Sequence, residues 1–180
     1  AMEYLSTNGD LREQINRLIR WQNTKAATAG FLTGLGGIIT MPATIPTNIA
    51  VVLFVQVRMI AAIAHMCGQD LKSDRVRTLV YACLVGDSAK EIFRDVGVAV
   101  GRKLTATAVS KISGKTLAAI NRRVGFRLLT RFGEKGVVNL GKIVPLVGGI
   151  ISATVDSVAT NTVGNVARNT FLPLVDRSST

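Results

Sequence analysis

The sequence is poor in the residue types on which most catalytic and metal sites depend. Its 180 residues include one histidine, two cysteines and 11 acidic residues, and only 5% are aromatic. Cys67 and Cys83 are separated by 15 residues of largely apolar sequence, a spacing that fits neither a zinc site nor a small disulfide scaffold. We therefore expect two reduced thiols in the core and no metal site. His65 shares a helix face with Arg58, and we interpret it as a packed structural residue.

Motifs for nucleotide binding and catalysis are incomplete. Residues 136–142 fit the G-x-x-x-x-G-K part of a phosphate-binding loop, but Ile143 stands where Ser or Thr would hold magnesium, and no strand is expected before the loop. Ser88 and Lys90 are too close on a helix to face each other as a catalytic dyad. No carboxylates are paired within an apolar stretch. We predict that the protein is not an enzyme and has no cofactor.

Acidic residues are scarce, and basic residues are concentrated in one region. The chain has 22 Lys and Arg residues and a formal net charge of +11 at pH 7. Residues 102–142 contain ten basic residues and one acidic residue. A hydrophobic content of 48% excludes a disordered basic tail. We expect an oriented basic surface that binds anionic lipid or a protein partner through Lys115, Arg122, Arg123, Arg127, Arg131, Lys135 and Lys142.

A second region lacks charge altogether. No charged residue occurs between Lys25 and Arg58, a run of 32 residues. About 20 apolar residues suffice to cross a bilayer, but two prolines interrupt this run. We predict a hydrophobic helical hairpin with arms over residues 26–41 and 46–67.

The rest of the chain shows helical periodicity. Apolar residues recur at intervals of three and four in residues 11–22, 76–84 and 88–100, and residues 143–167 are expected to form a final, mostly buried helix. No segment alternates with a period of two. The predicted fold is an all-α bundle of about six to eight helices around the central hairpin.

We expect residues 1–180 to form a single helical domain. We interpret residues 1–2 as a cloning scar and residues 173–180 as a flexible tail. The first residues lack the basic and apolar regions of a secretory signal, so a cytoplasmic location is expected.

The segment 116–132 is difficult to assign to one helix face. Arg123, Arg127 and Arg131 form a ridge directly beside the apolar ridge at 100° per residue. Either Gly125 breaks the helix, or the guanidinium groups lie at the edge of the buried face and reach solvent or an acid.

Two isolated charges in apolar sequence suggest a pair. Arg58 and Asp156 stand alone in two predicted helices, and an unpaired buried charge would cost several kcal/mol. We predict a buried Arg58–Asp156 ion pair. The alternative is that each side chain reaches solvent, and Asp70, Asp87 and Glu91 compete for Arg58.

Glycines recur at a spacing of four. This spacing lets helix backbones approach closely, in lipid or in a tight bundle. We expect close helix packing at Gly30, Gly34, Gly97, Gly101 and Gly148.

Several blocks of sequence resemble the EcsC family of bacterial proteins. The blocks are residues 30–37, 41–42, 56–64, 74–79, 121–130, 133–136, 139–142 and 144–149, and together they span about residues 25–170. The resemblance implies an α-helical domain without an established activity, named for a gene beside an ABC transporter and linked to membranes or secretion. It supplies no catalytic residues.

Three kinds of function are compatible with these features. The first is a non-enzymatic module that associates with an anionic membrane surface, or with a membrane-bound transport or secretion component, at the inner face of the membrane. The second is a soluble interaction domain or a domain that binds a hydrophobic ligand, with the hairpin as its core. A weaker alternative is a membrane-inserting, pore-forming domain. Nucleic acid is not an expected partner, because aromatic residues are not interleaved with the basic segment.

Overall fold

The computed structural model describes the backbone of residues 10–35, 41–99, 104–132 and 148–172. Side chains are described over the same ranges except residues 25–35, 41–51, 131–132 and 148–156. These ranges contain seven helices and no strand: α2 (Leu11–Leu35), α3 (Met41–Met66), α4 (Asp74–Cys83), α5 (Ser88–Asp95), α6 (Ala106–Ser110), α7 (Gly114–Phe132) and α9 (Gly148–Phe171). The prediction of an all-α bundle of six to eight helices is confirmed.

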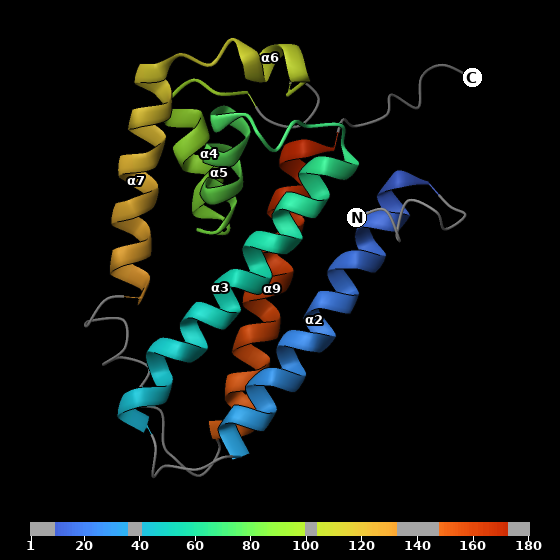
Figure 1. The fold of residues 1–180 in the computed structure, drawn as a ribbon, viewed down its shortest axis with the longest axis vertical. Coiled ribbons are helices and arrows are strands. Elements are labelled where there is room, and N and C mark those ends of the chain that lie inside the picture. Colours follow the sequence, from blue (N-terminus) through green and yellow to red (C-terminus); the bar gives the residue numbers. More distant parts are fainter. Residues whose placement is uncertain (1–9, 36–40, 100–103, 133–147, 173–180) are drawn as a thin grey trace.

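Three long helices form one side of the molecule. α2 and α3 run antiparallel, and α9 packs against both and runs parallel to α3 (Figure 1). Their shared interface buries Ile15, Ile19, Met59, Ile63 and Val163 almost completely. In the described residues, the second arm of the hairpin therefore packs against α9, which removes Met59 and Ile63 from water.

Polar side chains set the register between α2 and α9. The amide of Asn23 donates from Nδ2 to Oδ1 of Asn161 at 3.1 Å. The guanidinium of Arg168, seven residues after Asn161 on α9, donates to Oδ1 of Asn16, seven residues before Asn23 on α2. The two contacts are one heptad apart in opposite directions, which is the register of an antiparallel helix pair.

The shorter helices form the other side. α4 and α5 lie between α7 and the long helices, and α6 leads into α7 (Figure 1). Leu79, Phe93, Ile120 and Val124 are buried here and belong to the same hydrophobic cluster as the residues of the three long helices. The two sides therefore share one continuous core.

The predicted hairpin is present, but its helix boundaries are wrong. α2 is one continuous helix where two were predicted, and α3 begins at Met41, five residues before the predicted start. Pro42 is the second residue of α3, in the first turn, where the absence of an N–H has no cost. Pro46 lies inside the helix, so it marks neither the start nor the end of α3.

Two further boundaries differ from prediction. α5 ends at Asp95 although apolar periodicity continues to residue 100, because Gly97 has φ +72 and ends the helix with a left-handed turn. α9 (Gly148–Phe171) extends four residues beyond the predicted helix end at residue 167, whereas the predicted start at residue 143 lies outside the described residues. Helical periodicity therefore predicted the positions of α5 and α9 but not the residues at which they end.

In the described part of the chain, no helix is both long and apolar enough to cross a membrane. Both cysteines are free, and the predicted position in the core is confirmed for Cys83, which is buried, but only in part for Cys67, which is half-buried. His65 is exposed in the last turn of α3, and the expectation that it is a packed core residue is wrong.

Candidate functional site

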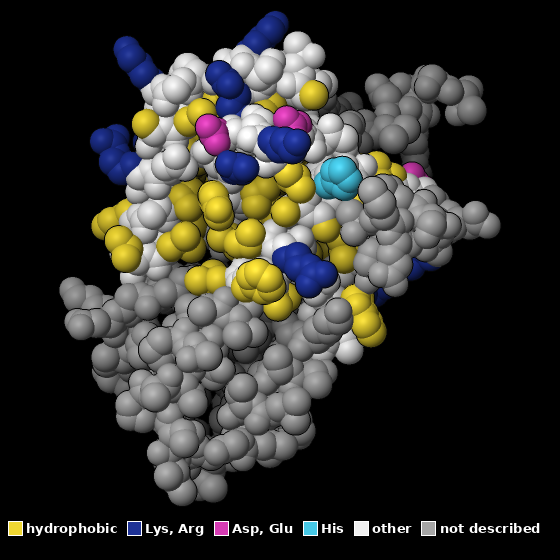
Figure 2. Space-filling view, in the orientation of Figure 1, with side chains coloured by type: hydrophobic (Ala, Val, Ile, Leu, Met, Phe, Trp, Pro, Cys, Tyr) yellow, Lys and Arg dark blue, Asp and Glu magenta, His cyan; other side chains and the backbone are white. Residues whose placement is uncertain are grey.

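The outward face of α7 combines basic and large apolar side chains. Lys115, Arg122, Phe126 and Leu129 are all exposed. At 100° per residue these four positions fall within about 60° of one another, and the face is about 21 Å long at 1.5 Å per residue. Figure 2 shows Lys and Arg side chains standing out along the upper part of the α7 edge and hydrophobic side chains lower on the same edge. We call these four residues the outer face of α7.

The opposite side of α7 explains why the outer face points to solvent. Ile120 is fully buried and Val124 is 4% exposed, and Leu117 and Leu128 pack against the same core. This apolar ridge contacts α4 and α5. Because the ridge fixes the rotation of the helix, Phe126 and Leu129 are left 66% and 73% exposed.

The arginine ridge of α7 faces α5 and is paired with acids. A guanidinium nitrogen of Arg123 donates to Oδ2 of Asp95, and Nη2 of Arg127 lies 3.5 Å from Oε2 of Glu91. α7 continues through Gly125, so the predicted alternative in which guanidinium groups reach an acid is confirmed for Arg123 and Arg127 and the helix break is wrong. Exposed pairs of this kind contribute about 0–1 kcal/mol.

Sequence reasoning missed the partners of this ridge. Glu91 and Asp95 are four residues apart on α5, as Arg127 and Arg123 are on α7. Matching spacing of opposite charges on two helices is the signal that could have predicted an antiparallel contact. The consequence is that the predicted basic surface divides into a paired ridge and the exposed Lys115 and Arg122.

The remaining predicted basic residues add nothing to the described site. The backbone of Arg131 lies in the last turn of α7, but its side chain is outside the described residues. Lys135 and Lys142 also lie outside them.

The predicted Arg58–Asp156 pair is not supported as a buried pair. Arg58 is exposed on α3, as the alternative interpretation expected, because the side chain can carry its charge into water. The side chain of Asp156 lies outside the described residues, so its partner is not described.

Close packing at Gly97 is a wrong prediction. Gly97 lies in the turn after α5, and no heavy atom lies within 4 Å of where a Cβ would stand. Gly30, Gly34 and Gly148 lie in α2 and α9, but their packing is outside the described residues, as is Gly101.

The tight glycine of the described bundle is Gly164. A Cβ there would lie 2.9 Å from Cγ1 of Ile19 and 3.2 Å from Cε of Met59. Gly164 continues the four-residue spacing that begins at Gly148, and following that series further along the sequence would have found it.

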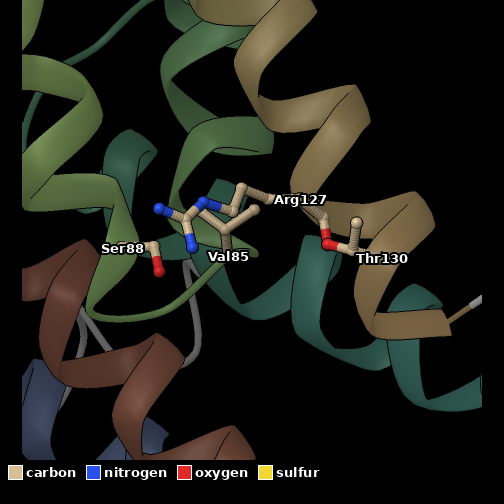
Figure 3. A pocket seen from close by; sticks show the side chains of 4 residues that line it. All are labelled: Val85, Ser88, Arg127 and Thr130. Carbon is tan, nitrogen blue, oxygen red and sulfur yellow. The ribbon is translucent and has the colours of Figure 1, made fainter. Parts of the chain in front are cut away.

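A small cavity lies between α5 and α7. It is open to solvent, has a volume of about 180 Å³ and is lined by Val85, Ser88, Arg127 and Thr130. Figure 3 shows Arg127 reaching from α7 across Val85 toward Ser88, with Thr130 farther along α7. The hydroxyl of Thr130 donates to the backbone oxygen of Arg127 at 3.0 Å. We call this space the α5–α7 cavity.

No group of three or more His, Cys, Asp or Glu side chains that could hold a metal ion occurs among the described residues. The sites that the structure does define are a basic and apolar helix face and a small arginine-lined cavity on an all-α scaffold.

The sequence matches a known protein family. The sequence model of the EcsC protein family matches residues 9–172, nearly the whole chain, and the protein belongs to that family. No curated protein and no solved structure matches the chain.

Proposed function

We propose that this protein is a non-enzymatic helical module that associates peripherally with an anionic membrane surface, at its cytoplasmic face, through the outer face of α7. The observation that carries the proposal is the presence of two exposed cations and two large exposed apolar side chains on one face of a helix. A surface helix with this combination suits the boundary between lipid headgroups and acyl chains.

The energetic contributions of the two kinds of side chain are comparable. A Lys or Arg close to an anionic leaflet contributes about 1 kcal/mol. Full burial of a Phe or Leu side chain contributes about 1.5–3 kcal/mol, of which the exposed parts of Phe126 and Leu129 would supply a share. Neither contribution is sufficient alone, so reversible and salt-dependent binding is expected.

The paired ridge supports the orientation. Asp95 and Glu91 lie on the α5 side of α7, where they neutralise Arg123 and Arg127. Lys115 and Arg122 are on the side away from α5, so the net positive charge of the described part of α7 is directed outward. A membrane-bound transport or secretion component with an acidic surface is the alternative partner for the same face.

Cosedimentation with vesicles tests the proposal. Neutral and anionic vesicles are compared at low and high salt, with wild type and with Lys115→Gln/Arg122→Gln and Phe126→Ser. The expected result is binding to anionic vesicles only, reduced roughly tenfold by either change, because about 1.4 kcal/mol corresponds to a factor of ten. Arg20→Gln/Lys72→Gln removes the same charge from exposed positions elsewhere and is the matched control.

Phe54→Ser is the matched apolar control. Phe54 on α3 and Phe126 on α7 are equally exposed, at 66%. Loss of binding with Phe54→Ser but not with Phe126→Ser would move the contact to the hairpin and contradict the proposal. Binding retained at high salt together with dye release would favour the pore-forming alternative, and no binding to any vesicle would favour a soluble interaction domain.

A further inference from the structure

We propose that the α5–α7 cavity binds a phosphate group, supplied either by an anionic phospholipid headgroup or by a soluble phosphate ester. The lipid form of this inference rests on the proposed function. The site is distinct from the outer face of α7, since its residues face α5, and the two are tested separately below.

The central residue of the cavity is Arg127. Its guanidinium carries five N–H donors in a planar fork that matches two phosphate oxygens. The fork extends across Val85 toward Ser88 and forms part of the cavity lining (Figure 3). Its contact with Glu91 is long, 3.5 Å between Nη2 and Oε2, and so engages the fork only weakly.

Glu91 acts as a replaceable partner. The side chains of Arg127 and Glu91 are 50% and 59% exposed, so the carboxylate can turn into water when another anion arrives. A phosphate that accepts two parallel hydrogen bonds from the fork forms a stronger contact than the existing one. The resting contact therefore holds Arg127 over the cavity without closing it.

The other lining residues suit a phosphate. Ser88 contributes a hydroxyl group from α5, while Val85 forms an apolar wall. The hydroxyl of Thr130 already donates to the backbone oxygen of Arg127, so Thr130 contributes only to the shape of the cavity. A water molecule takes about 30 Å³ of liquid volume, so a cavity of about 180 Å³ has room for a group of five heavy atoms.

The neighbouring charges favour the same ligand. Ser88 is the first residue of α5, at the positive end of the helix dipole. Asp87, which precedes it, is paired with Lys90 at 3.1 Å, so its repulsion of an incoming anion is reduced.

The position of the cavity connects it to the outer face of α7. Arg127 and Thr130 directly follow Phe126 and Leu129 in the chain, and consecutive helix residues are 100° apart. When Phe126 and Leu129 enter the apolar edge of a leaflet, Arg127 and Thr130 are at the depth of the headgroup phosphates.

Two binding measurements test the site. In solution, inorganic phosphate and glycerol phosphate are titrated into the labelled protein, and backbone amide shifts are followed at Ser88 and Thr130. On membranes, vesicles that contain phosphatidic acid are compared with vesicles of equal surface charge that contain a fatty acid carboxylate. We expect saturable shifts and a preference for the phosphate lipid.

Substitutions at Arg127 and at Glu91 are expected to change phosphate binding in opposite directions. Arg127→Gln is expected to weaken phosphate binding at least about tenfold, since a charge-assisted hydrogen bond is worth more than the 1.4 kcal/mol of a tenfold change. Arg127→Lys keeps the positive charge but loses the planar fork, so its phosphate binding should be little stronger than that of Arg127→Gln. Glu91→Gln is expected to tighten binding severalfold, because it removes the competing carboxylate.

Asp95→Asn is the matched control for Glu91→Gln. It makes the same charge change on the same helix but frees Arg123, which does not line the cavity. Equal effects of the two variants, or no effect of Glu91→Gln, would overturn the site and leave only general electrostatics. Equal binding to both vesicle types overturns the site but not membrane association. Shifts that depend on Arg127 without any vesicle binding support the site with a soluble phosphate and overturn the membrane proposal.

Discussion

Gly164 of α9 packs directly against Ile19 of α2 and Met59 of α3. The atoms nearest to a Cβ at this position include Cγ1 and Cγ2 of Ile19, at 2.9 and 3.0 Å. These atoms are attached close to the α2 backbone in a β-branched side chain with few rotamers, so they cannot move away easily. The absence of a side chain at Gly164 is therefore required by packing.

Gly164→Ala should destabilise the protein. Overpacking costs about 1–3 kcal/mol, while replacing a helical glycine by alanine returns about 1 kcal/mol, so we expect a net loss of about 1 kcal/mol. Urea denaturation measures the free energy of unfolding. The control is Gly125→Ala in α7, where no heavy atom lies within 4 Å of the added Cβ. This change should stabilise the protein by up to about 1 kcal/mol, and equal signs for the two variants would contradict the packing argument.

Cys83 makes stability sensitive to alkaline pH. Burial raises the pKa of the Cys83 thiol to about 12, and its hydrogen bond to Thr170 offsets part of that rise. The unfolded chain loses this proton first, so above the ordinary pKa of 9.0 the unfolded state binds fewer protons than the folded state. The free energy of unfolding must then fall as the pH rises from about 9 toward 12.

The contribution of Cys83 can be isolated by substitution. Between pH 9 and pH 10 the wild type should lose about 1 kcal/mol more than Cys83→Ala, since one pKa unit corresponds to 1.36 kcal/mol. Denaturation midpoints of both proteins at several pH values measure the difference. Lys and Tyr titrations are common to both proteins and cancel, so parallel pH curves would show that the thiol titrates normally in the fold.

At the scale of the element, α7 has one buried face and one exposed face. Ile120 has no exposed surface, whereas Leu129 is 73% exposed only nine residues later. Ile120→Ala should cost about 2–4 kcal/mol, because it leaves a cavity in the core. Leu129→Ala should change stability by less than about 0.5 kcal/mol, as is usual for surface positions.

Thermal and urea denaturation of the two variants check this difference, and vesicle binding gives the complementary result. Leu129→Ala should weaken binding to anionic vesicles although it leaves stability unchanged. A large loss of stability with Leu129→Ala would mean that the outer face is covered within the protein, and the proposed function would fail with it.

The arginines of α7 show what sequence reasoning could and could not reach within one element. Helical periodicity identified the apolar ridge of Ile120 and Val124 and placed Arg123 and Arg127 beside it. It could not determine which side would meet α5, because the acids that pair with the ridge lie on a different helix about 30 residues away. In the described structure, two of the predicted binding arginines are therefore paired with acids of α5.

At the scale of the whole molecule, α2 and α3 pack against a third long helix whose position local sequence does not reveal. Residues 26–57 have the composition of a membrane segment, and their helices α2 and α3 pack against α9, which begins about 80 residues after α3 ends. A bilayer and a third apolar helix satisfy the same hydrophobic requirement, so composition alone cannot distinguish them. The contact between Asn23 and Asn161 and that between Asn16 and Arg168 hold α9 against α2 in one register, which the composition of neither helix reveals.

The interpretation of the net charge also changes at this scale. Ten basic residues between residues 102 and 142 predict one continuous basic surface. In the described part, α5 brings Asp95 and Glu91 against that segment, so the exposed cations of α7 are Lys115 and Arg122 together with the half-exposed members of the paired ridge. Among the described residues, the outer face of α7 also includes two exposed apolar side chains, Phe126 and Leu129, that charge counting does not reveal.

The sequence by itself determined the helical fold, the antiparallel apolar hairpin and the family, because each depends on local periodicity, composition or recurring blocks of residues. Only the tertiary structure decided which arginines are paired, which glycine is crowded, which hydrophobic residues of α7 are exposed and where the α5–α7 cavity lies. These features depend on contacts between residues far apart in the chain, and the local sequence of neither segment determines whether such a contact forms.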